Sequence, residues 1–216
     1  MVAWSSGKDS AWALRDVIQT GIVRPVGLLT TVTREFHRVS MHGVRERILE
    51  LQADALGLPV TKVEIPSPCP NATYESLMGQ ALGELEKSGV ETIVFGDLFL
   101  EDIRAYRERQ LKTTGLRPLF PLWKRDTALL AKEMISGGLE AWLVCGDPKV
   151  LPASFVGRRF DDTLLEELPA GIDPCGENGE FHTCVLDGPM FRHRISATTG
   201  PIVERDGFVF ADLIPT

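Results

Sequence analysis

The sequence has few cysteines, and none is placed to bind zinc or to form a redox pair. The four are Cys69, Cys145, Cys175 and Cys184, which include no Cys-x-x-Cys pair and no zinc-ligand spacing. With 216 residues, the chain is long enough to bury a core without disulfide bonds. We therefore interpret the cysteines as reduced thiols, which is typical of a cytoplasmic protein.

An excess of positive charge and long apolar runs are also missing. The net charge is -7, which argues against a general nucleic-acid-binding surface because phosphates need a basic face. Charged residues from Lys8 to Asp16 interrupt any amino-terminal signal pattern, and no stretch approaches the length of a membrane span. The sequence therefore predicts a cytoplasmic protein with no membrane partner.

Two common phosphate-binding motifs are absent as well. No segment matches Gly-x4-Gly-Lys-Ser/Thr or Gly-x-Gly-x-x-Gly, so neither a Walker-type nucleotide hydrolase nor a dinucleotide dehydrogenase has support. The 44% of hydrophobic residues is that of an ordinary globular protein. No internal repeat or low-complexity tract divides the chain.

A different phosphate site is indicated at the amino terminus. The turn from Ser5 to Ser10 follows the apolar run Val2-Ala3-Trp4 and leads into a helix-like segment. Unpaired amides and the macrodipole at a helix start bind anions, and a glycine lets the backbone approach a ligand. Asp9 either contacts Mg²⁺ or caps the helix, and an ordinary capped helix start would use similar residues. The candidate nucleotide-binding residues of this turn are Ser5, Ser6, Gly7, Lys8, Asp9 and Ser10.

Strand-like and helix-like segments alternate over the first two thirds of the chain. This alternation predicts an α/β fold with a Rossmann-like parallel sheet and helices on both of its faces. The expected strands are residues 2–4, 26–33, 60–65, 92–95 and 141–145, and the expected helices are residues 44–56, 74–86, 103–114 and 126–135. We expect a nucleotide-binding domain over residues 1–150.

The pattern changes after residue 150, where we expect a small carboxy-terminal subdomain over residues 151–216. A short helix is predicted at residues 163–168. Alternating runs at residues 181–186, 191–197 and 202–211 predict a small antiparallel element, with a turn at Asp206-Gly207.

Polar residues follow the expected parallel strands, at the edge where such sheets bind ligands. They include Thr31 and His42 behind the second strand, Asp97 behind the fourth, and Gly146-Asp147 behind the last. We expect Thr31 and His42 to line a nucleotide pocket. Asp97 orients substrate or metal, or caps the next helix. Arg104 is a candidate clamp for a phosphate or carboxylate, and Trp123 borders the pocket or packs in the core.

A second polar cluster extends from Asp173 to Thr183. It combines glycines with Glu177, Asn178, Glu180 and His182. The carboxylates could hold a cation or an amine, and an imidazole titrates near neutral pH, which suits proton transfer. The alternative is a polar surface hairpin loop.

These motifs resemble a known family. The turn Ser5 to Ser10 is similar to the PP-loop Ser-Gly-Gly-x-Asp-Ser of ATP pyrophosphatases, with Ser6 in place of the second residue. Together with three further segments it resembles the diphthine–ammonia ligase family, over nearly the whole chain. Those segments are Gly96-Asp97-Leu98 with Arg104 to Arg107 behind it, Pro121-Leu122-Trp123, and Gly176 to Thr183.

The resemblance implies an HUP-type fold, and ATP and Mg²⁺ as cofactors. It implies ATP cleavage between the α and β phosphates, transfer of AMP to a carboxylate, and displacement of AMP by ammonia. The expected catalytic residues are Lys8, Asp9, Asp97, Glu177, Glu180 and His182. The expected substrate-binding residues are Arg104, Trp123, Asn178 and Thr183, and Asp9 is the expected metal contact.

One difference from the family leaves the acceptor open. Ligases that act on diphthine typically have Gly-Glu-x-Gly-Glu-Tyr-Glu-Thr in the last segment, whereas this chain has Phe181 and His182 at the sixth and seventh positions. The acceptor is a small-molecule or protein-borne carboxylate, and a homodimer is left open. Two other hypotheses remain: a non-catalytic adenine-nucleotide-binding module, and an adenylating enzyme that modifies tRNA.

Overall fold

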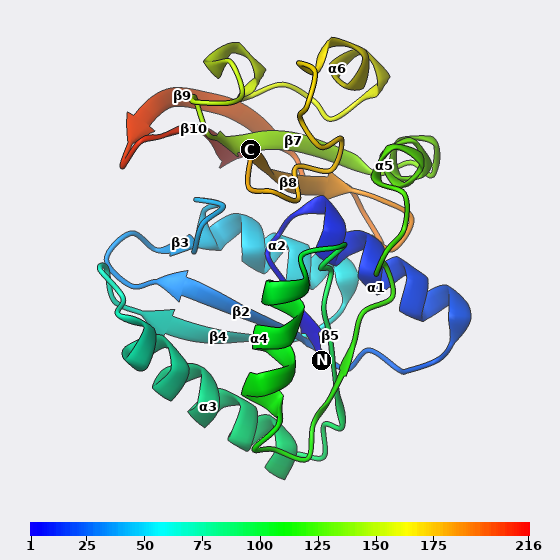
Figure 1. The fold of residues 1–216 in the computed structure, drawn as a ribbon, viewed down its shortest axis with the longest axis vertical. Coiled ribbons are helices and arrows are strands. Elements are labelled where there is room, and N and C mark those ends of the chain that lie inside the picture. The colour runs from blue at the N-terminus through cyan, green and yellow to red at the C-terminus, as the bar shows by residue number, and fades with distance from the viewer.

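The computed structural model describes residues 1–216 and contains two separate β-sheets (Figure 1). In the first sheet the parallel strands lie in the order β4, β2, β1, β5, β6, and the short β3 pairs antiparallel with the end of β2. Its strands are β1 (Val2–Ala3), β2 (Leu28–Thr33), β3 (Arg38–Val39), β4 (Val60–Ile65), β5 (Thr92–Val94) and β6 (Arg117–Leu119). The predicted parallel sheet is confirmed, although β3 and β6 were not expected.

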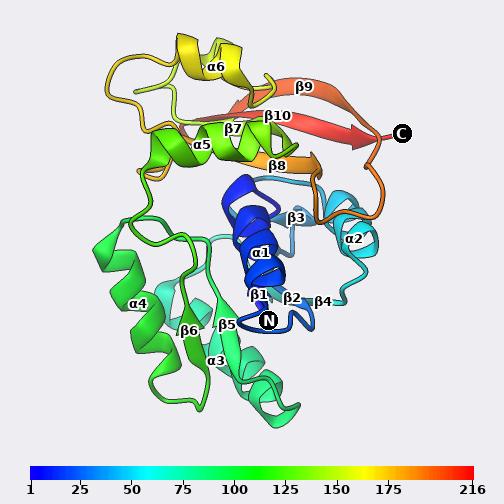
Figure 2. The ribbon, with the colours of Figure 1, turned by 90° about the vertical axis from the view of Figure 1, so that its right-hand side faces the viewer.

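Helices cover both faces of this sheet, as expected for right-handed crossovers. Helices α1 and α2 lie on one face, and α3 and α4 lie on the other (Figures 1 and 2). The helices are α1 (Lys8–Thr20), α2 (Glu46–Leu56), α3 (Asn71–Lys87), α4 (Glu101–Leu111), α5 (Thr127–Ser136) and α6 (Asp162–Glu167), with a 3₁₀ turn η1 (Ala153–Phe155). None of the helices combines the length and apolar character that a bilayer span requires.

The second sheet is antiparallel, with strand order β8, β7, β10, β9. Its strands are β7 (Glu140–Gly146), β8 (Phe181–Asp187), β9 (Ala197–Arg205) and β10 (Phe208–Pro215). The predicted turn at Asp206-Gly207 joins β9 to β10. Both residues have positive φ angles, 53° and 81°, which suit a two-residue hairpin turn.

Two expectations about strands were wrong. Residues 141–145 were assigned to the parallel sheet, but β7 pairs antiparallel with β8 and β10. Gly146-Asp147 therefore does not lie at the carboxyl edge of the first sheet. Residues 191–196 form no strand, because Arg192 donates its backbone N–H to Ala55 of α2 instead of a ladder partner. The expected domain boundary near residue 150 stays a prediction.

Helices α1 and α2 are packed between the two sheets (Figure 2). A core of 37 buried residues extends from the first sheet through these helices to β7 and β8, and it includes Trp4, Trp12 and Phe181. The opposite face of the first sheet has its own cluster of 11 buried residues, shared with α3 and α4. The amino end of α1 is consequently enclosed by both sheets.

Gln52 of α2 links the amino-terminal turn to the second sheet. Its side chain is fully buried, and its Oε1 accepts a hydrogen bond from Trp4 Nε1 at 2.9 Å. Its Nε2 donates to the backbone oxygens of Ser6 at 3.1 Å and Val185 at 2.7 Å. Because buried polar groups are costly when unpaired, one side chain stabilises β1, the turn and β8 together.

We predict that Gln52→Leu lowers the free energy of unfolding by about 2–4 kcal/mol, because it leaves several buried polar groups without this partner. Denaturant unfolding followed by circular dichroism measures the change. The control is Gln19→Leu, which makes the same exchange at an exposed position of α1. Equal stabilities of the two variants would contradict this role of Gln52.

Candidate active site

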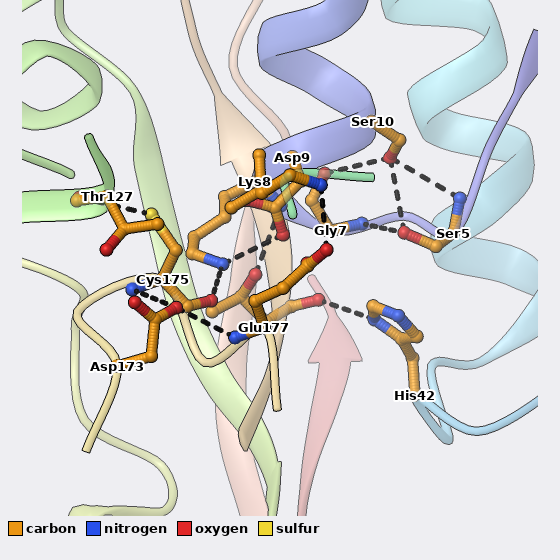
Figure 3. Close-up of polar contacts among 12 residues, drawn as sticks. Ser5, Gly7, Lys8, Asp9, Ser10, His42, Thr127, Asp173, Cys175 and Glu177 are labelled. Atoms are coloured by element: carbon orange, nitrogen blue, oxygen red, sulfur yellow. Dashed lines mark hydrogen bonds and ion pairs between the residues drawn. The ribbon is translucent and has the colours of Figure 1, made fainter. Parts of the chain in front are cut away.

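A cavity of about 610 Å³ lies at the carboxyl edge of β1, β2 and β5. It brings together side chains from the amino-terminal turn, from the segment behind β2, from the turn behind β5 and from the loop before β8. Figure 3 shows those of the amino-terminal turn with His42 and Glu177. The predicted site residues that line it are Ser5, Asp9, Ser10, Thr31, His42, Asp97, Glu177 and His182. Two polar clusters more than 160 residues apart in the sequence thus share one cavity.

The amino-terminal turn has the backbone shape of an anion site. Ser6 has a φ of 68°, in the left-handed region that favours glycine, and Gly7 is the residue before α1. The Gly7 N–H donates to Ser5 Oγ at 3.3 Å, and the Lys8 N–H donates to Thr183 Oγ1 at 3.1 Å. Hydroxyl oxygens therefore occupy positions where the amides at the start of α1 could bind phosphate oxygens.

Close packing requires glycine at two positions, Gly7 in the amino-terminal turn and Gly96 behind β5. A Cβ on Gly96 would lie 2.8 Å from the backbone nitrogen of Ser10, and a Cβ on Gly7 would lie 2.8 Å from Cε1 of His42. The end of β5 therefore passes directly against the first turn of α1. Asp97, which follows Gly96, is thereby placed at the cavity wall beside that turn.

The side chain of Lys8 is enclosed by protein groups. Its side chain is only 2% exposed and does not line the cavity. The ammonium donates to Asp9 Oδ2 at 2.8 Å and to the backbone oxygen of Cys175, and it lies over the rings of Phe160 and Phe181. These neighbouring groups enclose the charge of Lys8 (Figure 3), and its expected part in binding the phosphates stays a prediction.

Asp9 is the carboxylate of the turn that is available to a ligand. Its Oδ2 accepts from Lys8, whereas its buried Oδ1 has no hydrogen-bond partner. Burial raises the pKa of the Asp9 carboxyl, and the Lys8 ammonium opposes this rise. An unpartnered carboxylate oxygen at the cavity wall is suited to a cation that arrives with a polyphosphate.

Glu177 joins the loop before β8 to the turn behind β5. Its Oε1 accepts from the backbone N–H of Leu98 at 2.7 Å and of Phe99 at 3.3 Å. Burial raises the pKa of Glu177 to about 7, and the nearby carboxylates of Asp9 and Asp97 add to the rise. Glu177 is therefore a carboxyl group that can exchange a proton near neutral pH.

His42 and His182 form a pair of rings at the cavity wall, with centroids 4.6 Å apart. His42 Nδ1 lies 3.0 Å from the backbone oxygen of Thr183. Because a carbonyl can only accept, Nδ1 carries the proton and Nε2 keeps its lone pair. Burial lowers the pKa of His42 to about 3 and that of His182 to about 4, so both rings are neutral at pH 7.

Three predicted residues from the second cluster stabilise the loop rather than line the cavity. Glu180 Oε1 accepts from the Asp173 N–H and from Asn178 Nδ2, each at 3.0 Å. Thr183 accepts from Lys8 through its hydroxyl group. These contacts hold the loop in the shape that presents Glu177 and His182.

Arg104 and Trp123 also lie outside the cavity lining. The guanidinium of Arg104 lies 4.8 Å from the ring centres of both Trp123 and Phe120, and its Nε donates to Glu108 at 2.8 Å. The expected role of Arg104 as a substrate clamp stays a prediction.

The apolar inner wall of the cavity was not predicted from the sequence. Leu29 and Ile93 of the sheet, Met78 and Leu82 of α3, and Leu111 of α4 form this wall. In the sequence they have the spacing of ordinary core residues, which gives no signal of a cavity. We call this apolar region the inner arm.

Arg107 of α4 also lines the cavity, and no specific role was predicted for it from the sequence. Its Nε lies 3.9 Å from Asp97 Oδ1 and has no hydrogen-bond partner. Its guanidinium lies over the ring of Phe95, 5.3 Å from the ring centre. Arg107 therefore places a positive charge at the cavity wall, next to Asp97.

We predict that the histidine pair makes stability depend on pH. Each native-state pKa lies below the ordinary value of 6.5, so the unfolded state takes up protons first as the pH falls. The free energy of unfolding should therefore fall from pH 6.5 to about 4 through both rings, and on to about 3 through His42. His182→Asn should reduce this slope by up to about 1.4 kcal/mol per pH unit.

Urea unfolding at a series of pH values measures this slope. His37→Asn is the control, because the side chain of His37 is 80% exposed. If His182→Asn has the same slope as the unmodified protein, the histidine pair does not cause the pH dependence.

The fold and the cavity define the class of protein. A parallel sheet leads from its central strand through a hydroxyl-rich turn into a helix, and the cavity lies at the carboxyl edge of that sheet. This is the arrangement of a nucleotide-binding α/β protein.

Comparison with known proteins identifies the family. The family model for the diphthamide synthase N-terminal domain matches residues 1–118, and that for the C-terminal domain matches residues 126–208. A diphthine–ammonia ligase of Danio rerio is 30% identical over 94% of this chain and 89% of its own length. The Homo sapiens protein of the same name is 28% identical over 96% of this chain and 85% of its own length. The chain belongs to the diphthine–ammonia ligase family.

Proposed function

We propose that this protein is an ATP-dependent, AMP-forming ligase that converts a carboxylate into an amide with ammonia. One observation supports this most directly: the phosphate-binding turn and the loop with Glu177 and His182 line the same cavity. A protein that only senses a nucleotide has no need for a titrating carboxyl group and two neutral imidazoles beside the phosphates. The names of the relatives agree with this activity.

The first step is the formation of an acyl adenylate. The carboxylate oxygen of the acceptor attacks the α phosphorus of ATP, the bond between the α phosphorus and the bridging oxygen breaks, and pyrophosphate leaves. Ser5 and Ser10 line the cavity, and we propose that their hydroxyl groups and the amides at the start of α1 stabilise the charge on the phosphates. Catalysis of this step is mainly electrostatic and positional.

The site fits a magnesium ion that is bound together with ATP. No group of three or more histidine, cysteine or acidic side chains converges on a point, so the protein alone does not form a metal cage. Mg²⁺ usually combines one or two carboxylates with phosphate oxygens and water, and the unpartnered Oδ1 of Asp9 supplies such a ligand. When bound, the ion would neutralise charge on the phosphates.

The second step forms the amide. The nitrogen of ammonia attacks the acyl carbon, the bond from that carbon to the AMP oxygen breaks, and one proton leaves the nitrogen. Glu177 is the group we propose to accept this proton, because its pKa of about 7 lets it be ionised at neutral pH. AMP and the amide are the products.

The name of the relatives contains diphthine, and we propose diphthine as the first acceptor to test. The cavity has an open mouth bordered by exposed Met41, so a protein-borne residue could reach it. The assay combines ATP, an ammonium salt and a diphthine-bearing protein. It measures AMP, pyrophosphate and the mass change from carboxyl to amide. ATP consumption without any amide product, across diphthine and other carboxylates, would reject the ligase assignment.

We predict that Asp9→Asn lowers acceptor-dependent pyrophosphate release by roughly 10²–10³-fold, because the cation that would neutralise the phosphate charge loses its carboxylate ligand. The matched control is Asp102→Asn, at an exposed position in the first turn of α4. Thermal melting checks that both variants fold. A folded Asp9→Asn protein with the turnover of the control would remove Asp9 from the mechanism.

We predict that Glu177→Gln separates the two steps. The amide oxygen of glutamine can still accept from Leu98 and Phe99, so the loop keeps its place, but the side chain no longer accepts a proton. Amide formation should fall by roughly 10²-fold while the pyrophosphate burst in the first turnover persists. Glu166→Gln, exposed on α6, is the control. An equal loss in both steps would assign Glu177 to adenylation instead.

A further inference from the structure

A second cavity, of about 320 Å³, opens between α3 and α4. Glu75 and Gly79 of α3 and Arg109 of α4 border it and are exposed to solvent, so this cavity faces the outside. Its lining residues belong to α3, α4 and the residues just after α4. These two helices cover the face of the first sheet away from α1 (Figures 1 and 2). We call it the α3–α4 cavity.

The α3–α4 cavity and the active-site cavity are separated by side chains. Leu82 and Gln110 line both of them, so these two residues form part of the wall between the cavities. Gln110 is held by a hydrogen bond of 2.8 Å from its Nε2 to the hydroxyl group of Tyr106, which also lines the α3–α4 cavity. A wall made of side chains can open by rotamer changes, whereas a backbone wall cannot.

The inner arm of the active-site cavity connects this wall to the amino-terminal turn. It is lined by aliphatic side chains from the sheet and from both helices, including Leu29, Met78 and Leu111. An ammonium ion would lose its hydration there without a partner, whereas neutral ammonia is small and carries no charge. The inner arm is therefore a passage that favours ammonia over ammonium and over other ions.

The proposed reaction needs three substrates at one point. ATP occupies the turn and the acceptor occupies the mouth, so the third substrate needs a separate approach to the acyl carbon. Water that enters with ammonia would hydrolyse the acyl adenylate, and an apolar passage limits its access.

We propose that ammonia enters through the α3–α4 cavity and reaches the acyl adenylate past Leu82 and Gln110, along the inner arm. Ammonium loses its proton to solvent at the outer opening, and the neutral molecule then passes inward. This inference rests on the proposed ligase activity. It adds a route for one substrate that is distinct from the mouth used by ATP and the acceptor.

Two glycines of α3 provide a matched test. A Cβ on Gly79 or on Gly83 would meet no atom within 4 Å, and leucine is a better helix former than glycine. Gly79→Leu and Gly83→Leu should therefore both fold. Gly79 lines the α3–α4 cavity, whereas Gly83, one helical turn further on, does not. Only the first substitution narrows the proposed route.

The experiment measures AMP and amide formation by the full chain while the ammonium concentration is varied at a fixed pH. Gly79→Leu should raise the KM for ammonia by roughly tenfold and leave the KM for ATP unchanged. At low ammonium concentration the Gly79→Leu protein should also release more AMP per amide formed, because water hydrolyses the acyl adenylate before ammonia reaches it. Gly83→Leu should behave like the unmodified protein.

One outcome would contradict the ammonia route alone, and another would contradict the ligase function as well. If Gly79→Leu has an unchanged KM for ammonia, or an equal rise in the KM for ATP or acceptor, the route through the α3–α4 cavity is wrong while the ligase function stands. If the unmodified protein forms AMP but never amide, the proposed function itself fails, and the route fails with it.

Discussion

The rest of the structure depends on how the amino end of α1 is held against the second sheet. The Lys8 N–H donates to the Thr183 hydroxyl group, the Val185 N–H donates to the Ser6 oxygen at 2.9 Å, and Gln52 donates to the backbone oxygens of both Ser6 and Val185. These buried bonds fix the left-handed Ser6 and hold the loop before β8 beside the turn. The loop before β8 and the start of β8 therefore complete a cavity whose other walls come from the first sheet and its helices.

Much of the fold could be predicted because its signals are local. Alternating strands and helices predict the parallel sheet, and Gly57 ends α2 with a φ of 63°, as a left-handed glycine does. Asp126 caps α5 by accepting from the Leu129 N–H, which is also readable from the sequence. Residue chemistry identified both polar clusters. Their placement in one cavity could be expected from the family resemblance but not from spacing.

The remaining features could not be predicted because they depend on tertiary partners. Strand β7 looks like a buried parallel strand, and only its pairing with β8 and β10 assigns it to the second sheet. The bonds of Lys8 to Asp9 and to the Cys175 oxygen could not be read from the sequence of the turn, because Cys175 is distant in sequence. Leu82 reads as a core residue of α3, although it lines two cavities. Burial, charge pairing and cavity walls are set by segments distant in sequence.

The central claim is that the turn before α1 binds the nucleotide phosphates while the loop before β8 faces the α phosphorus. A crystal structure of the protein with a non-hydrolysable ATP analogue and Mg²⁺ tests this most directly. We expect the phosphates at Ser5 to Ser10, with the α phosphorus facing Glu177 and His182 across the cavity. Phosphates bound away from that turn, or an α phosphorus directed away from the loop, would contradict the account.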